Sequence, residues 1–303
     1  MSPNLDYVAR INRSIDYVVA HLHEPLPLEV VAKAAAFSPF HFHRVFKLVM
    51  DETLAHFVKR LRLERAVTLM SRADPPPLTR IALDCGFASS SDFSRSFKKH
   101  YGTSPSAFDV SAHRDRHRDR MLDQLTSPEN RHRLERLPPS PSQPGFDVVI
   151  RELPPRTVAY RRVLQPYREG AVLRASEALV RWAKARGAEE AQWLGYQWDD
   201  PEVVALDKCR YDVAVVLDDV TPDDEVGRLR FPAMTVAEVA LAGTVDLELR
   251  VLDWLFGVWL PRSSWVPDDQ PCFEAWNGLP YTHGTSHVDL RIQLPVVATR
   301  DRY

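Results

Sequence analysis

Apolar residues recur every three or four positions through the first hundred residues, which is the spacing of one face of an α-helix. The clearest stripe consists of Leu5, Val8, Ile11, Ile15, Val18, Val19 and Leu22. Shorter helical segments follow, because Pro27 can begin one, Ser38-Pro39 provides an N-cap and a first-turn proline, and Gly86 can end another. A longer helix is predicted over 54–70. The N-terminal third is therefore predicted to be all-α.

From residue 146 the pattern changes to short β-like runs: FDVVI, TVAYRRV, YDVAVVL, TVAEVAL and HVDLRIQL. Two helical stretches separate them. This half also matches itself, since residues 154–159 resemble 232–237 and Trp198 meets Trp276 at an offset of 78, while 212–217 answer 289–294 at 77. Each copy reads strand, helix, strand, strand, which predicts an α+β domain built by duplication.

A second repeat lies in the helical part. The pattern F-x-R-x-F-K at residues 42–47 recurs at residues 93–98, 51 positions later, each time after a short helix and a tight turn. The two phenylalanines of each copy lie four apart and form a buried face, which leaves the Arg and Lys outside. This arrangement predicts two helix-turn-helix units, whose second helices enter major grooves of DNA. The helix between them spans about 27 Å, enough with the packed helices to serve two adjacent grooves.

The amino-acid composition of residues 109–145 differs from that of the segments on either side. Arg, His and Asp alternate first, and four prolines follow at 138, 139, 141 and 144, which cannot sustain a helix. We predict domains at 1–108 and 146–303 with a linker at 109–145. His113 and His117, four apart, have the spacing of a metal pair, but no carboxylate or thiol completes the set, so a solvated basic helix is favoured.

Charge supports this division. Residues 1–137 hold 21 Lys and Arg against 16 Asp and Glu, a net of +5, and the remainder holds 18 against 25, a net of −7. All seven tryptophans lie in the acidic half. No membrane span or secretory signal is seen, so we expect a cytoplasmic protein that does not contact membrane. The three widely spaced cysteines predict reduced, buried thiols.

The helical part resembles the AraC family of bacterial transcription regulators over residues 5–108. The resemblance rests on SPFHFHRVFK at 38–47, on Arg62 and Ala66, on the Ile81-Ala82 and Gly86-Phe87 pairs, on DFSRSFK at 92–98 and on GTSP at 102–105. Ala36 and Asp51 replace glycines that are usual in the family. The implied groove-facing residues are Phe40, His43, Arg44, Ser90, Ser91, Ser94 and Arg95. Arg suits guanine acceptors and Ser either kind of edge, while Lys47 and Lys98 suit phosphates.

The 78-residue offset places Tyr196-x-Trp198 opposite Glu274-x-Trp276. Residues two apart on a strand share a face, so we expect these four side chains to converge on a cleft if the two halves face each other. A carboxylate between aromatic rings suits a desolvated organic cation. The alternative is that both tryptophans are core residues and Glu274 an exposed strand residue.

Residues 146–296 resemble the GyrI-like (gyrase-inhibitor-like) ligand-binding domain of multidrug-responsive regulators. The resemblance rests on VAY at 158–160, GY at 195–196, DDP at 199–201, YDV at 211–213, Gly243, WLPRS at 259–263 and PCFE at 271–274. It implies that Glu274 meets cationic ligands, and it adds Tyr160 to the ligand-binding residues. Trp276 stands where Tyr is common in the family.

We therefore expect a DNA-binding transcription regulator whose second domain senses a small, hydrophobic, aromatic cation. Its expected partners are promoter DNA and this ligand, and RNA polymerase stays open as a third. An alternative makes the second domain a hydrolase with Glu274 as base, although no His, Ser or Cys nucleophile is well arranged. Another makes it a protein-binding module. No catalytic, cofactor or metal site is predicted.

Overall fold

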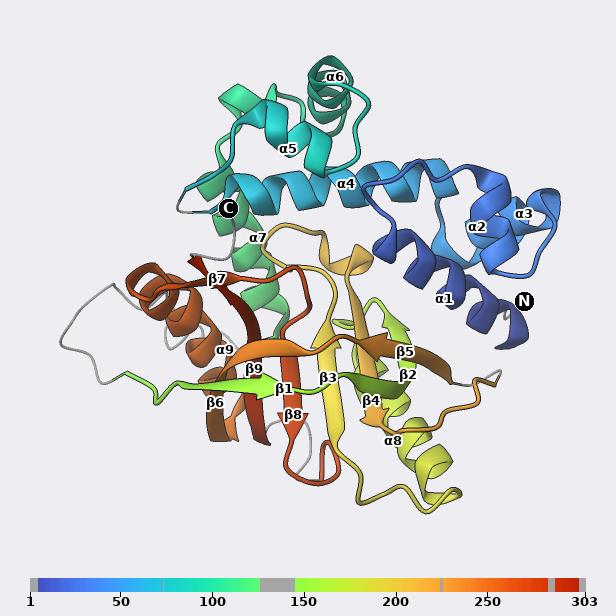
Figure 1. Cartoon of the computed structure of the whole chain (residues 1–303), viewed down its shortest axis with the longest axis vertical. Coiled ribbons are helices and arrows are strands. Elements are labelled where there is room, and N and C mark those ends of the chain that lie inside the picture. The colour runs from blue at the N-terminus through green and yellow to red at the C-terminus, as the bar shows by residue number, and fades with distance from the viewer. Residues whose placement is uncertain (1–4, 73, 126–144, 224–225, 283–286, 300–303) are drawn as a thin grey trace. The chain divides into compact units, whose positions relative to one another are not determined.

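Figure 1 shows the computed structural model, which describes residues 5–72, 74–125, 145–223, 226–282 and 287–299. The chain divides into two compact units. The first consists of Met1–His117 with Glu202–Val204 and Asp223–Gly227, and the second of Arg118–Pro201, Ala205–Pro222 and Arg228–Tyr303. In the described parts of the chain, no helix has the length and apolar character needed to cross a membrane.

The N-terminal unit is all-α, as predicted. Its α-helices are α1 Leu5–Ala20, α2 Leu28–Ala34, α3 Pro39–Met50, α4 Leu54–Met70, α5 Leu78–Asp84, α6 Ser90–Tyr101 and the first part of α7 Val110–Leu125. The pairs α2–α3 and α5–α6 are the two predicted helix-turn-helix units. The long helix α4 runs between them, as Figure 1 shows.

Hydroxyl groups begin the second helix of each pair. The Ser38 side chain accepts a hydrogen bond from the backbone N–H of His41 at 3.4 Å, and Ser89 accepts one from Asp92 at 3.1 Å. Each bond satisfies a donor that the first helical turn leaves unpaired. The N-cap predicted at Ser38 is therefore confirmed, and Ser89 supplies the same cap in the second copy.

The repeated phenylalanines form the core of each unit. Phe42, Phe46, Phe93 and Phe97 are all buried. Phe46 also contacts Phe57 of α4, with ring centroids 5.5 Å apart. This contact joins the first unit to the connecting helix. The predicted inward face of both second helices is therefore confirmed.

The two residues that replace the usual glycines adopt the left-handed backbone conformation that glycine favours. Ala36 has φ 53° and Asp51 φ 54°, where Gly86 and Gly102 of the second copy both have φ 81°. An L-residue pays for this conformation because its Cβ approaches the neighbouring carbonyl. The first unit thus keeps the same turns as the second, at a cost in free energy.

We expect Ala36→Gly to raise the free energy of unfolding by about 0.5–1 kcal/mol, because glycine adopts the left-handed conformation without strain. The Ala36 methyl group is exposed, so its removal costs no packing. Urea unfolding followed by circular dichroism measures the change. Gly86→Ala is the matched opposite, since a Cβ there would lie 2.7 Å from the Leu22 carbonyl oxygen. A loss of stability from Ala36→Gly would contradict the assignment of strain.

The segment predicted as the start of the linker is an α-helix, α7, but it is not solvated along its whole length. His113 and Arg118 are each only 7% exposed, which corrects that expectation. His113 packs against the rings of Tyr101 and Phe108. Arg118 forms an ion pair with Asp253. The local sequence shows the basic residue but not its distant acidic partner. The four predicted linker prolines fall outside the described residues.

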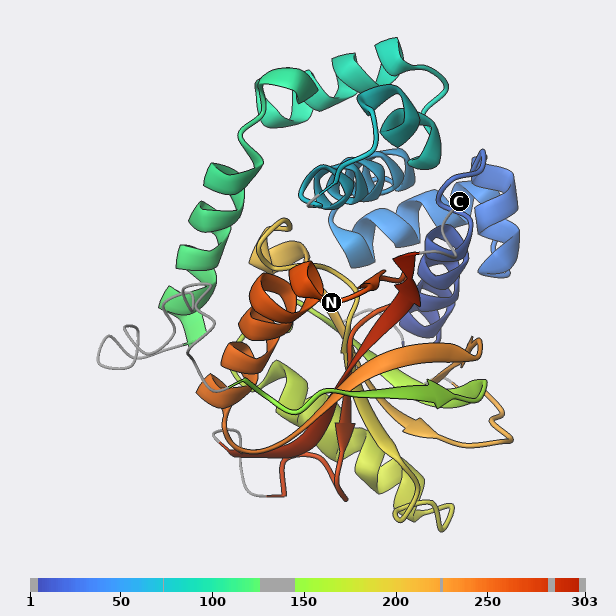
Figure 2. The same cartoon turned by 60° about the vertical axis from the view of Figure 1, so that its left-hand side comes forward.

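The C-terminal unit is an α+β domain, as predicted. Its elements are β1 Val149–Leu153, β2 Arg156–Leu164, α8 Ala171–Lys184, β3 Trp193–Gln197, β4 Arg210–Val216, β5 Gly227–Phe231, β6 Met234–Thr244, α9 Val245–Trp254, β7 Trp265–Pro267, β8 Phe273–Trp276 and β9 His287–Ala298. A π-helical turn, Leu255–Trp259, continues α9. The strands form one strongly twisted sheet, best seen in Figure 2.

The strand order supports the predicted duplication. The sheet runs β1-β6-β9-β8-β3-β4-β2-β5, with β7 added beside β9. Exchanging β1 with β5, β2 with β6, β4 with β9 and β3 with β8 reverses this order and leaves it otherwise unchanged. Likewise α8 packs on β2 and β4, and α9 on β6 and β9. Each copy is therefore the predicted strand, helix, strand, strand, preceded by one further strand.

The central strand pair gives the sheet two different sides. In β3 and β8, Tyr196 pairs with Phe273 and Gly195 with Glu274. Directly paired residues point to the same side of a sheet and successive residues to opposite sides. Tyr196 and Phe273 therefore lie on one side, which we call the aromatic side. Glu274 lies on the other side. We call this the helix side because the charge of Glu274 raises the pKa of Glu248 on α9, so α9 lies near Glu274.

Candidate DNA interface and ligand site

The predicted DNA-reading residues are displayed on α3 and α6. Phe40, His43, Arg44 and Lys47 are exposed on α3, and Phe40 is 76% exposed although it is apolar. Its ring lies beneath the Arg44 guanidinium, with the Cζ atom 5.9 Å from the ring centroid. An outward phenylalanine beside an arginine suits a groove in which a thymine methyl group neighbours a guanine.

The second recognition helix presents a more polar surface. Ser91, Ser94, Arg95 and Lys98 of α6 are exposed, and Ser90 in its first turn is half-buried. These exposures agree with the predicted positions on the outer side of the helix. The contact with DNA that is assigned to each residue stays a prediction.

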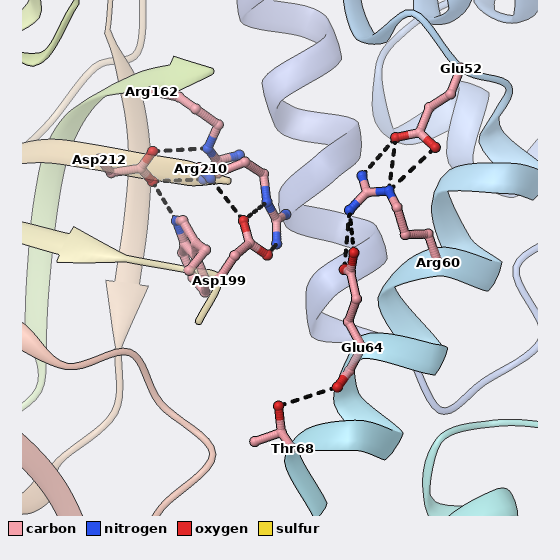
Figure 3. A network of polar contacts seen from close by, with 9 residues as sticks. Glu52, Arg60, Glu64, Thr68, Arg162, Asp199, Arg210 and Asp212 are labelled. Atoms are coloured by element: carbon pink, nitrogen blue, oxygen red, sulfur yellow. Dashed lines mark hydrogen bonds and ion pairs between the residues drawn. The ribbon is translucent and has the colours of Figure 1, made fainter. Parts of the chain in front are cut away.

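A buried ion triad fixes the connecting helix. Arg60 of α4 lies between Glu52 and Glu64, with its Nη2 2.6 Å from Glu52 Oε1 and its Nη1 3.0 Å from Glu64 Oε1, as Figure 3 shows. Burial lowers the pKa of Arg60, but the two carboxylates outweigh it and raise the pKa above its ordinary value. The guanidinium therefore stays charged. Glu52 precedes the first turn of α4, so the triad ties the end of the first unit to this helix.

Arg62 has a structural role that its place in the family pattern did not reveal. Its Nε donates to the Leu22 carbonyl at 2.9 Å and its Nη2 to the Glu24 carbonyl at 2.6 Å. These bonds hold the segment after α1 against α4. Because α4 has 17 residues, its length is about 26 Å at 1.5 Å per residue. The two recognition helices are thus carried by one rigid spacer.

In the C-terminal unit, five polar side chains on the helix side form what we call the acid–tyrosine cluster: Tyr211, Glu248, Cys272, Glu274 and Tyr281. Tyr211 donates its hydroxyl hydrogen to Glu274 Oε2 at 2.5 Å. Tyr281 has a positive φ of 59° and packs its ring 4.8 Å from that of Trp276. Glu274 is half-buried and Trp276 is buried.

Gly195 is what allows Tyr211 and Glu274 to meet. A Cβ at this position would lie 1.8 Å from the Tyr211 hydroxyl and 2.6 Å from Glu274 Oε2. Any other residue would push these two side chains apart. A glycine within a strand often marks such a close approach, so the sequence did contain a signal for this contact.

The cluster is short of positive charge. Burial raises the pKa of Glu274 to about 7, against hydrogen bonds from Tyr211 and Trp276 that lower it. Burial and the charge of Glu274 also raise the pKa of Glu248. Two desolvated carboxylates repel each other, so a proton or another cation is favoured between them. Burial likewise raises the pKa of Cys272, which keeps the thiol protonated and poorly suited to nucleophilic attack.

The five predicted ligand-binding residues do not converge. Glu274 and Trp276 lie on the helix side, while Tyr160 and Tyr196 are buried on the aromatic side with Trp198 packed against them. The expected single cleft is therefore wrong. The repeat offset of 78 residues pairs equivalent positions correctly in β2 and β6, because Val158 and Val236 lie in the same core cluster. The same offset is out of register between β3 and β8, where Tyr196 and Glu274 lie on opposite sides of the sheet. A slip of one residue moves a side chain to the opposite face of a strand.

The residues on the aromatic side are tied into the fold. The Trp198 indole N–H donates to Asp212 at 2.7 Å, and Arg162 binds both oxygens of the same carboxylate at 2.9 and 2.7 Å (Figure 3). Arg210 binds Asp199 in the same way. Trp198 is only half-buried, so the alternative of a core residue is met in part, and its ligand-binding role stays a prediction. Tyr211, Glu248 and Tyr281, which the fold places beside Glu274, were not among the residues predicted from the sequence.

Among the described residues, no three His, Cys, Asp or Glu side chains are grouped so that they could hold a metal ion. All three cysteines are free thiols, and Cys85 and Cys209 are buried.

Comparison with known proteins identifies both halves. Residues 31–110 match a family described as a helix-turn-helix domain, and residues 146–297 match the GyrI-like small molecule binding domain. The regulatory protein SoxS of Salmonella typhimurium is 32% identical over 98 residues, which is 32% of this chain and 91% of SoxS. The HTH-type transcriptional regulator YbfP of Bacillus subtilis is 32% identical over 102 residues, 34% of each chain.

Further relatives match the same helical region. The right origin-binding protein of Escherichia coli is 30% identical over 104 residues, 34% of this chain and 36% of that protein. The chain thus spans about a third of the length of the right origin-binding protein and of YbfP.

Two solved structures resemble one half each. The DNA-binding domain of AdpA, solved with a target DNA, is 26% identical and has a TM-score of 0.32, covering 35% of this chain and 95% of that one. The EcmrR C-terminal domain is 15% identical with a TM-score of 0.41, covering 50% and 98%. From the matched regions, the chain belongs to the GyrI-like small-molecule-binding family and joins that domain to an AraC-type helix-turn-helix DNA-binding domain.

Proposed function

We propose that this protein is a one-component transcription regulator of the multidrug-responsive kind. Its domain at 1–108 reads two adjacent major grooves of promoter DNA in the cytoplasm. Its domain at 146–303 binds a lipophilic aromatic cation beside Glu274, and residues 109–145 join the two. The observation that carries the proposal is the half-buried Glu274 carboxylate, which lies next to a second acid, Glu248, and is flanked by Tyr211, Trp276 and Tyr281.

The chemistry of the acid–tyrosine cluster supports a cation over a neutral ligand. A buried carboxylate gains most from a partner of opposite charge that has itself left water. Aromatic rings add attraction through their electron-rich faces. The net charge of −7 on the second half favours the same sign of ligand.

Helix α7 offers a route from ligand to DNA. Its last part belongs to the C-terminal unit, where Arg118 binds Asp253 of α9 and Gln124 Nε2 donates to the Tyr167 carbonyl at 2.9 Å. Met121 and Leu122 pack against Leu249, the residue after Glu248. A ligand that moves α9 therefore acts directly on α7, whose first part belongs to the DNA-binding unit. Coupling of this kind needs two states that differ in ligand affinity.

The DNA-reading surface is tested by Arg95→Ala. We expect affinity for a duplex selected from random sequences to fall by about 5- to 150-fold, the value of one base contact. Lys98→Ala should weaken specific and non-specific binding alike. Fluorescence anisotropy with labelled duplexes measures both. Arg181→Ala, which removes an exposed arginine of α8, is the matched control and should bind as the wild type does. Unchanged specific affinity in Arg95→Ala would show that α6 does not read bases through this residue.

A further inference from the structure

Arg156, the first residue of β2, holds a buried guanidinium on the aromatic side of the sheet. The residue is only 9% exposed. Its Cζ atom lies 4.5 Å from the centroid of the Phe273 ring. Its Nη1 donates to the Gln293 amide oxygen at 3.1 Å, and its Nη2 lies 4.0 Å from the Met234 sulfur. The buried Nε makes no hydrogen bond with the described residues.

Two further arginines of the same sheet, whose side chains are also buried, differ from Arg156. The Arg162 guanidinium donates hydrogen bonds to both carboxylate oxygens of Asp212, and Arg210 donates to Asp199. The positive charge of each of these two arginines is therefore neutralised by a carboxylate. No carboxylate of a described residue pairs with Arg156. Its neighbours are the Gln293 amide, the Met234 thioether and the Phe273 ring, and Tyr196 also acts on it electrostatically.

The nearest acid in its hydrogen-bond network is already engaged. Gln293, which accepts from Arg156, donates a hydrogen bond from its Nε2 to Glu238 Oε2 at 2.8 Å. Glu238 in turn lies 3.0 Å from Arg151 and 3.9 Å from Arg291. The network therefore holds three arginines and one carboxylate, which leaves it with an excess of positive charge.

Arg156 is charged at neutral pH. Burial lowers its pKa to about 10, which still leaves about one molecule in a thousand deprotonated at pH 7. A buried charge without a counter-ion is costly, and a buried N–H without a partner calls for an explanation by a bound group. The fold itself does not need the charge, because Met234 occupies the equivalent place in the second copy at the offset of 78.

We propose that Arg156 is an anion site that binds the carboxylate of a small organic acid. One carboxylate oxygen would accept the hydrogen bond from Nε, since the planar guanidinium edge matches a carboxylate. Phe273 and Met234 favour an acid with an apolar body over a strongly hydrated inorganic ion. The site is distinct from the one at Glu274, because Phe273 and Glu274 are successive residues that face opposite sides of β8. The regulator thus has a second ligand site of opposite charge preference, back to back with the first.

The test uses the full chain with sodium benzoate as the organic acid and sodium chloride at equal ionic strength as the inorganic anion. Thermal unfolding is followed by tryptophan fluorescence, which reports the C-terminal domain because all seven tryptophans lie between residues 182 and 276. We expect benzoate to raise the midpoint saturably in the wild type, and chloride to give no saturable rise. An equal rise with chloride, or none with benzoate, would overturn the proposal.

Three variants assign the effect to the guanidinium. Arg156→Met should fold with an unchanged or higher midpoint, since an unpaired charge is removed, and should lose the benzoate response. Arg156→Lys, which keeps the charge but not the Nε–H, should bind benzoate at least about tenfold more weakly. Arg151→Met alters the exposed arm of the same network and should keep the response. Equal benzoate shifts in Arg156→Met and wild type would overturn the site.

The two ligand sites are separated by Glu274→Gln. This variant should keep the benzoate response while it loses the response to a lipophilic cation. If Glu274→Gln removed the benzoate response as well, benzoate would be bound through the acid–tyrosine cluster and the Arg156 site would be refuted.

Discussion

Replacement of Arg60 by Met is expected to lower the free energy of unfolding of the DNA-binding domain by about 3–5 kcal/mol, because two carboxylates stay buried without a counter-ion. Glu52 and Glu64 have side chains that are 5% and 10% exposed, so solvent does little to relieve their repulsion. Urea unfolding followed by circular dichroism measures the loss. Tryptophan fluorescence, which comes only from the second half, should stay unchanged.

Two further variants separate charge from packing. Arg80 forms an ion pair with Asp84 but is 70% exposed, so Arg80→Met should cost no more than about 0.5 kcal/mol. The triple variant Glu52→Gln, Arg60→Met, Glu64→Gln removes all three charges and should recover most of the stability. A loss below about 1 kcal/mol for Arg60→Met alone would show that the triad does not hold the connecting helix.

Affinity for a lipophilic cation is expected to rise with pH up to about 7 and then to level off. The bound cation needs Glu274 ionised, and burial raises the pKa of that carboxyl to about 7 in the empty site. Below that pH each unit should lower the affinity about tenfold, since the cation must displace a proton. Titration with tetraphenylphosphonium, followed by tryptophan fluorescence, measures the dependence, and neutral triphenylphosphine oxide is the matched ligand control.

Glu274→Gln should remove both the binding and its pH dependence. The same raised pKa sets the sign of the stability change in the empty protein. The folded state holds the proton more tightly than the unfolded state, so stability is lost as pH rises from about 4.5 to about 7. Glu274→Gln should remove that loss. Cation binding that keeps its strength at pH 5 would contradict the assigned role of Glu274.

The helical half could be predicted closely because its signals are local. The cap at Ser38 and the buried Phe42 and Phe46 follow from spacings within one or two helical turns. The exposed Arg44 and Arg95 follow from the same period. What the local sequence did not contain were the distant partners, such as the carbonyls that Arg62 binds and the Asp253 carboxylate that neutralises Arg118 on α7.

The ligand site was predicted only in part. Glu274 and Trp276 were found, but the partners that surround them come from β4, from α9 and from the segment after β8, which only the folded sheet brings together. Because strands alternate, a repeat aligned one residue out of register placed Tyr196 on the wrong side. Gly195 was the one available clue, since a strand glycine opposite Glu274 leaves space that Tyr211 fills.

Cation binding at Glu274 is proposed to change how the chain binds DNA. The most direct test measures the affinity of the full chain for its selected duplex with and without saturating tetraphenylphosphonium. We predict a change of at least about fivefold in wild type and none in Glu274→Gln, with DNA changing the cation affinity by the same factor, as linkage requires. Equal DNA affinity of the wild type with and without the bound cation would contradict the account.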